Sequence, residues 1–99
     1  MNDKIERFLI TNSINGRNAI IVREAIAKAL LCARLTEKEF QALPPAKRYT
    51  SAHAKNHIHE RTTLTPEVRR ELALLIDRAI HVEQKERDAE RAKMSKITA

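Results

Sequence analysis

The sequence predicts an all-α protein: a small bundle of four to five helices with a central apolar helix and a long C-terminal helix projecting from the body. The chain has 99 residues, the length of one domain. One glycine and 3% aromatic residues are too few for the turns and strands of a β-sandwich or barrel. The apolar residues recur at spacings of three and four, which is typical of helices.

The first helix is expected from Asp3 to about Thr11. Its apolar residues Ile5, Phe8 and Leu9 follow helical spacing, and Asp3 can act as the N-cap. The following segment, 12–18, contains the only glycine directly after an asparagine, which is a strong turn signal.

The central helix is expected from Asn18 to Arg34, the most apolar stretch of the chain. Because apolar residues lie on both sides of it, we expect the other helices to enclose it. One face contains Val22, Ala25, Ile26, Ala29, Leu30 and Ala33, and the opposite side contains Ile20, Ala27 and Leu31.

A short third helix is expected from Glu37 to Leu43. Thr36 and Glu39 have the spacing of a capping box, while Leu35 and Phe40 have that of a hydrophobic staple. The helix should end before Pro44-Pro45, because a proline disfavours helical geometry in the residue before it.

A fourth, exposed helix is expected from about Ser51 to Glu60. Apolar residues are scarce between 46 and 63, so we expect little of this segment to join the core.

The last helix starts with Thr65 as N-cap and Pro66 at the first helical position. Its apolar stripe ends near Val82, so we divide the chain into a helical globular domain, 1–82, and a charged helical extension with a frayed tail, 83–99. The extension should project into solvent and fray near Ser95. The stripe consists of Val68, Leu72, Leu75, Ala79 and Val82, widened by Ile76 and Ile80.

The charge pattern points to nucleic acid. The net charge is +6, and the segment 47–61 combines basic residues and histidines with few apolar ones. If this segment is helical, Arg48, Ala52, Lys55 and His59 share one face. We therefore predict a small regulatory or accessory protein that contacts phosphates, of DNA rather than RNA; the alternative is an exposed segment that is basic by composition alone. The predicted nucleic-acid-binding residues are Lys47, Arg48, Tyr49, Lys55, Asn56, His59 and Arg61.

A second function class stays open: a non-enzymatic adaptor or inhibitor, of the kind encoded by phages or plasmids, docking on a larger enzyme or nucleoprotein complex. Its docking element would be the basic segment or the helix 83–94. The apolar stripe of the last helix could instead pair with a second copy as a short coiled coil, giving a homodimer.

Enzymatic, metal and cofactor chemistry is not expected. No phosphate loop or nucleophile elbow is present, and His53 and His57 lack further ligands at suitable spacing. Cys32 lies in an apolar run, where we expect it to be buried, and a single cysteine forms no internal disulfide. No apolar stretch approaches the length of a membrane span, so we expect a cytoplasmic protein without membrane contact.

Overall fold

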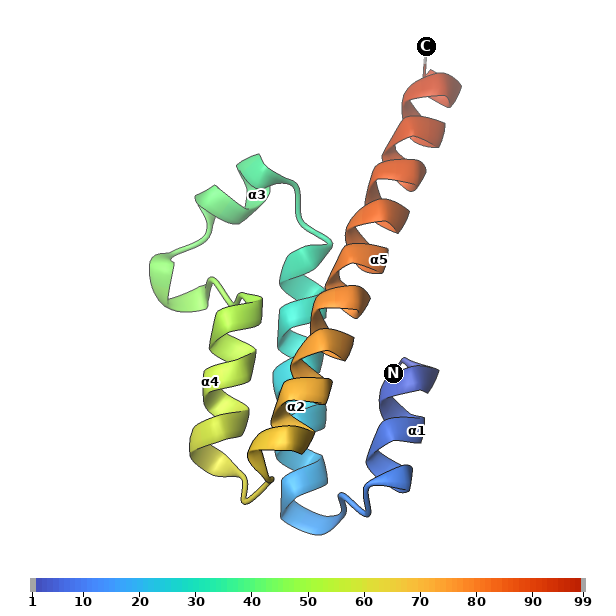
Figure 1. The fold of residues 1–99 in the computed structure, drawn as a ribbon. Coiled ribbons are helices and arrows are strands. Elements are labelled where there is room, and N and C mark those ends of the chain that lie inside the picture. The colour runs from blue at the N-terminus through green and yellow to red at the C-terminus, as the bar shows by residue number, and fades with distance from the viewer. Residues whose placement is uncertain (1, 99) are drawn as a thin grey trace.

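The chain forms an antiparallel helical bundle with a short helical excursion at one end (Figure 1). The structure is a computed structural model that describes residues 2–98, with side chains described for 2–94. The predicted all-α bundle with a projecting C-terminal helix is confirmed. The elements are α1 (Asp3–Thr11), α2 (Gly16–Ala33), α3 (Glu37–Ala42), a 3-10 turn (Pro45–Lys47), α4 (Ser51–Arg61) and α5 (Pro66–Thr98).

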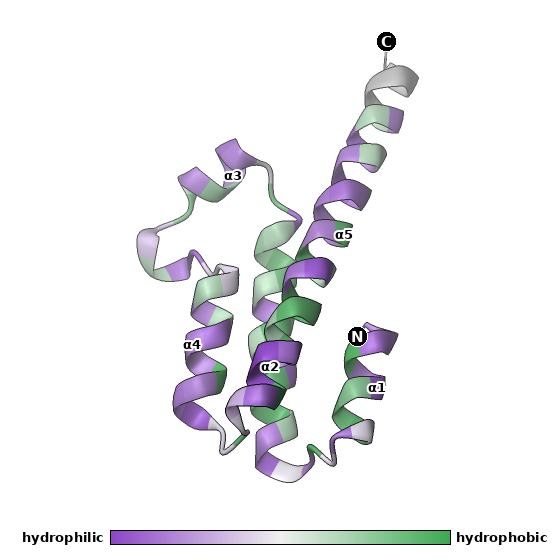
Figure 2. Cartoon of the chain, in the orientation of Figure 1, coloured by the Kyte–Doolittle hydropathy of each residue, from purple (hydrophilic) through white to green (hydrophobic). Residues whose placement is uncertain are grey.

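The core lies between α2, α4 and α5, which pack against one another, while α1 packs against α5. Hydrophobic residues concentrate on α1, on α2 and on the part of α5 that follows its hydrophilic first turns, whereas the outer half of α5 is mainly hydrophilic (Figure 2). The largest fully buried side chains are Ile5, Leu9, Val22, Ile26, Leu72 and Ile76. The central apolar helix is thus α2, as predicted.

Two details at the start of the chain differ from the prediction. The N-cap of α1 is Asn2, not Asp3: the Asn2 Oδ1 accepts hydrogen bonds from the backbone N–H groups of Lys4 and Ile5, at 2.9 and 3.3 Å. The second helix begins at Gly16 rather than Asn18. The backbone reverses between the two helices through positive φ angles of 54° at Ser13 and 57° at Gly16.

The expected enclosure of the central helix is wrong for one of its faces. Ile20 is 55% exposed and Leu31 is 69% exposed. The surrounding helices cover the side of α2 that carries Val22, Ile26 and Ala29, and among the described residues no element covers the opposite side. The helix is therefore apolar beyond what this bundle buries.

The fourth helix is exposed over most of its length, as expected, but one of its faces joins the core more closely than predicted. Its predicted range is nearly correct, but Ala54 is 0% and Ile58 is 2% exposed. These two residues lie one turn apart on the face of α4 that packs against α2, where Ala25 and Ala29 belong to the same buried cluster. Small side chains on α2 let the helices approach closely, so two well-placed apolar residues suffice.

The short third helix has the predicted capping box. The Thr36 N–H donates to Glu39 Oε1 at 3.0 Å, and the Glu39 N–H donates to Thr36 Oγ1 at 3.2 Å. The hydrogen bond from the Thr36 backbone lowers the pKa of the Glu39 carboxyl. The helix ends at Ala42, and Leu43 is extended, as expected for a residue before proline.

The apolar stripe of α5 ends earlier than predicted, since Ala79 is buried while Val82 is 48% exposed. Beyond it α5 projects from the bundle (Figure 1), but several of its side chains bond to residues near the end of α2 and the start of α3. The Arg87 guanidinium donates to the carbonyl oxygens of Ala33 and Leu35, at 3.2 and 2.6 Å. These bonds satisfy carbonyl groups at the end of α2, so this part of the extension is not simply solvated.

Two further cationic groups tie the extension to the same end of the bundle. Arg34 pairs with Glu83 and Glu90, at 2.7 and 3.0 Å, and Arg91 pairs with Glu39 at 2.6 Å. The α5 backbone remains helical to Thr98, past Ser95, where fraying was predicted; residue 99 lies outside the described residues.

Arg87→Ala is expected to lower the free energy of unfolding by about 2 kcal/mol, because hydrogen bonds from a charged donor to the two carbonyls are lost. Arg91→Ala is the matched control on the same helix: its side chain is 51% exposed, and an exposed ion pair contributes less than about 1 kcal/mol. Urea denaturation measures both values. Equal losses would show that Arg87 does not cap α2.

No helix in the described part of the chain is long and apolar enough to cross a membrane.

Candidate nucleic-acid interface

The predicted binding residues fall into two groups at different places. Lys47, Arg48 and Tyr49 belong to the connection that follows α3, at one end of the bundle. The other four residues lie on α4: Lys55, Asn56, His59 and Arg61. The face expected to contain Arg48 together with Lys55 does not form, because Thr50 caps the helix and α4 starts at Ser51.

Arg48 serves the connection in which it lies. Its guanidinium donates to the carbonyl oxygens of Leu43 and Gln41, at 3.2 and 2.7 Å, and lies 6.0 Å from the centroid of the Phe40 ring. The side chain is half-buried. Arg48 therefore closes the α3 segment on itself, whereas its neighbour Lys47 is exposed.

Tyr49 is an anchor between α2 and α4. Its ring stacks on His53, with centroids 5.7 Å apart, and the Lys28 Nζ lies 5.7 Å from its centroid. Partial burial raises the pKa of the Tyr49 hydroxyl. Because its ring already has these partners, it is not placed as a free platform for a base.

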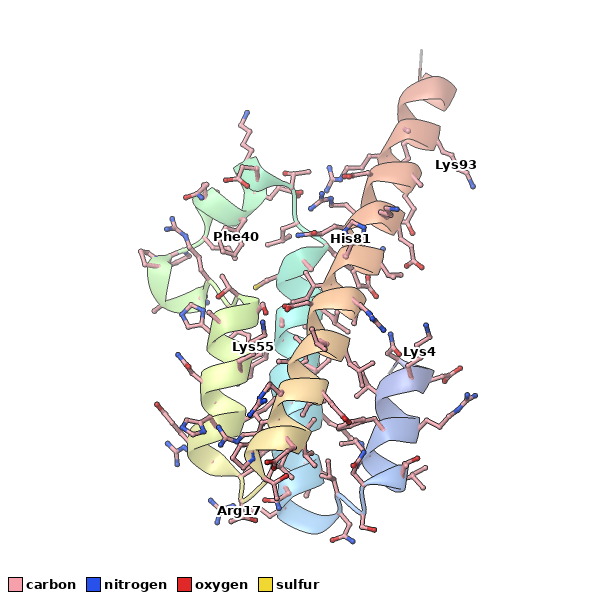
Figure 3. The ribbon with its side chains drawn as sticks, in the orientation of Figure 1. Lys4, Arg17, Phe40, Lys55, His81 and Lys93 are labelled. Atoms are coloured by element: carbon pink, nitrogen blue, oxygen red, sulfur yellow. The ribbon has the colours of Figure 1, made fainter. Side chains whose placement is uncertain are left out.

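Lys55 lies on the side of α4 that faces α5 (Figure 3). Its Nζ donates to Asp77 Oδ2 at 2.9 Å, and the Ser51 hydroxyl donates to Asp77 Oδ1 at 2.7 Å. Desolvation raises the pKa of the Asp77 carboxyl, but the bonds from Lys55 and Ser51 outweigh it, so the net shift is downward. Lys55 is thereby held over the seam between α4 and α5.

A groove of about 300 Å³ opens along this seam and is lined by three cations. Lys55 comes from α4, and Arg69 and Arg70 come from the first turns of α5. No acidic residue is among the described lining residues, although Lys55 itself is bonded to Asp77. We call it the α4–α5 groove. The remaining lining is apolar and consists of Ile58, Pro66, Leu72, Ala73 and Ile76.

The three cations have different partners. Arg69 contacts the Nδ1 of His59, and Lys55 bonds to Asp77, whereas Arg70 has no hydrogen bond or ion pair with the described part of the chain. Arg70 is also exposed. It is therefore the cation of the groove most available to an added anion.

Asn56 and Arg61 lie on exposed positions of α4 and are not among the residues that line this groove. Arg61 is near the connection to α5, at the end of the bundle that also carries Arg17 (Figure 3). That end is fastened by the Asn18 side chain, which donates to the Thr63 hydroxyl at 3.0 Å.

Arg69 and Arg70 were missed because α5 has a balanced charge over its length. The spacing of residues along α5 could have indicated Arg70. Successive intervals of four, three and four place four residues on one side of the helix: Pro66, Arg70, Ala73 and Asp77. The acid Glu71 instead lines a hollow on the α1 side of α5, with Phe8 and Leu74.

The histidines do not gather into a metal site. His53 completes the N-terminal capping of α4, with its Nδ1 accepting from the Thr50 N–H at 3.1 Å, while His59 contacts Arg69. Among the described residues, no three His, Cys, Asp or Glu side chains come together as metal ligands.

A second hollow, of about 470 Å³, lies between the α3 segment and the bundle. Cys32 lines it and is half-buried rather than fully buried as expected, because the α3 segment covers the end of α2 only loosely. Phe40, Tyr49 and Arg87 line the same hollow. The charges here are mixed, since Glu37 also contributes to the lining, so it is less suited to an anion than the α4–α5 groove.

Comparison with known proteins gives no relative: no family model, no curated protein and no solved structure matches this chain.

Proposed function

We propose that the protein binds nucleic acid by holding phosphates along the α4–α5 groove, as a non-enzymatic regulatory or accessory factor. The observation that carries the proposal is the convergence of Lys55, Arg69 and Arg70 on one groove whose described lining contains no acid. Cations on two facing helices can neutralise adjacent phosphates of one strand.

The dimensions of the groove suit a short run of backbone. From Pro66 to Ile76, α5 rises about 15 Å, and duplex DNA carries one phosphate per strand for about each 3.4 Å of its axis. The apolar floor can lie against sugars while the cations at the rim meet phosphates. Contacts of this kind confer affinity and position but read no sequence.

Arg70→Gln is expected to weaken binding to a mixed-sequence duplex DNA and to reduce the slope of log K against log salt by about 0.9, the value of one phosphate contact. Fluorescence anisotropy of a labelled duplex, titrated between about 50 and 200 mM salt, measures both quantities. A single-stranded DNA and an RNA of the same sequence establish the preferred substrate.

Arg78→Gln is the matched control. Arg78 is exposed on the same helix but faces α1, where it lines two hollows with residues such as Leu75. The two substitutions remove the same charge, so a general electrostatic effect would weaken binding equally. Equal effects of the two variants, or no binding of the unaltered protein at low salt, would refute the proposal.

Docking on a protein partner is the second candidate function, and the projecting half of α5 favours it. The inner side of this extension is occupied by Arg87 and Arg91, while Lys85, Glu86 and Lys93 are exposed. The test is to measure the affinity of a protein partner for the Arg70→Gln variant in the absence of nucleic acid. An affinity equal to that of the unaltered protein would favour docking over nucleic-acid binding.

A further inference from the structure

The uncovered face of α2 forms a stripe of defined chemistry. Ile20, Ala27 and Leu31 follow spacings of seven and four, so they lie on one line along the helix, and all three are exposed. At about 100° per residue, this line lies opposite the buried residues Val22 and Ile26. We define the α2 stripe as Ile20, Glu24, Ala27, Lys28 and Leu31.

Single exposed apolar residues are ordinary on protein surfaces, and Ile10 and Leu74 are such residues on other helices. The α2 stripe differs because its two large side chains, Ile20 and Leu31, are at opposite ends of one helix face with the small Ala27 between them. Two helices can approach closely at such a place.

The stripe is complementary to itself in the antiparallel direction. Consider a twofold axis that crosses the exposed face of α2 at the height midway between residues 25 and 26. This axis places Ile20 of one copy opposite Leu31 of the other. The same operation places Glu24 opposite Ala27 of the second copy, with Lys28 one residue, or about 1.5 Å along the axis, further on. The symmetry generates each apolar contact and each Glu24–Lys28 pair twice, as in an isologous interface.

The charged side chains of the stripe are available for this pairing. Glu24 has no hydrogen bond or ion pair within the described part of the chain, and both Glu24 and Lys28 are exposed. The Lys28 Nζ lies 5.7 Å from the Tyr49 ring centroid, and the ammonium has three N–H donors, so it can also donate to a carboxylate.

We propose that two copies of the chain associate through antiparallel α2 helices, with Ile20 packed on Leu31 and Glu24 paired with Lys28 of the second copy. The surface differs from the C-terminal stripe that the sequence suggested for dimerisation. It faces away from α5, so the α4–α5 groove of each copy stays open, and the inference does not depend on nucleic-acid binding.

Analytical ultracentrifugation of the full chain is the first test. The unaltered protein should show a concentration-dependent dimer, and Leu31→Glu should be monomeric. Leu74→Glu is the matched control, because Leu74 is 61% exposed on α5 and lies outside the stripe. A monomer at every concentration, or a dimer that survives Leu31→Glu, overturns the proposal.

A charge-exchange experiment tests the antiparallel pairing itself. Glu24→Lys places lysines opposite Lys28, and Lys28→Glu places glutamates opposite Glu24, so each variant alone should dimerise at least about tenfold more weakly. In a mixture of the two variants every pair across the interface is again of opposite charge, and the dimer should recover as a heterodimer. If the mixture dimerises no more tightly than either variant alone, the proposed pairing is wrong. If dimerisation recovers in the mixture, ion pairs within one helix cannot be the cause, because residues 24 and 28 of each variant chain have the same charge.

Discussion

Ile58→Ala is expected to lower the free energy of unfolding by about 2–5 kcal/mol, the usual cost of truncating a fully buried isoleucine. Ile58 is 2% exposed and is the only large apolar side chain that α4 contributes to the buried cluster in the described residues. Its loss leaves a cavity under α4 that the adjoining alanines cannot fill, and it also widens the α4–α5 groove, which Ile58 lines. Chemical denaturation followed by far-UV circular dichroism measures the change.

Ile10→Ala provides the matched control, since Ile10 is 76% exposed on α1 and its truncation should change stability by no more than about 0.5 kcal/mol. The same atoms are removed in both variants. Similar stabilities for the two would mean that α4 is not packed into the core, and the geometry of the α4–α5 groove would lose its basis.

The second large effect concerns binding. Replacing Lys55, Arg69 and Arg70 together with glutamine is expected to reduce the salt slope of DNA binding by about 2.7, because three phosphate contacts are lost. At about 50 mM salt the affinity should fall by a factor on the order of a thousand. Anisotropy titrations with the duplex used for Arg70→Gln measure both.

A control triple variant separates the groove from net charge. Lys4, Arg7 and Arg78 are exposed on α1 and on the α1 side of α5, and Lys4 and Arg78 line one hollow. Their replacement by glutamine lowers the formal charge from +6 to +3, as the groove variant does. If the control weakens binding as much as the groove variant, the effect is one of overall charge and the α4–α5 groove is not the binding site.

Local capping signals predicted the starts of α3 and α5, although the N-cap of α1 is Asn2 rather than the predicted Asp3. Thr36 with Glu39, and Thr65 before Pro66, mark helix starts that depend on side chains within three residues of each other. Such signals are complete within the sequence, so the starts of α3 and α5 needed no tertiary information.

Burial was harder to predict because it depends on what lies opposite. The α4 segment contains few apolar residues, yet Ala54 and Ile58 occupy core positions because α2 presents small residues there. On α2 the opposite error occurs, because Ile20 and Leu31 are apolar and were expected to be covered, but no described element covers them. Composition within a segment cannot distinguish these cases.

The candidate site shows the same limit. Lys55 was predicted as a binding residue, but its companions Arg69 and Arg70 belong to another helix and are adjacent only after folding. Arg48 was predicted for the same surface, and the fold uses it to close the α3 connection instead. The groove depends on how α4 and α5 are aligned with each other. A count of charges along one segment gives no information about that alignment.

The bonds from Arg87 to the end of α2 and from Arg91 to Glu39 attach the projecting half of α5 to that end of the bundle. The second hollow is lined by Arg87 itself, whereas the α4–α5 groove lies at the first turns of α5. A group fused to this end of the chain would therefore lie closer to the second hollow than to the groove.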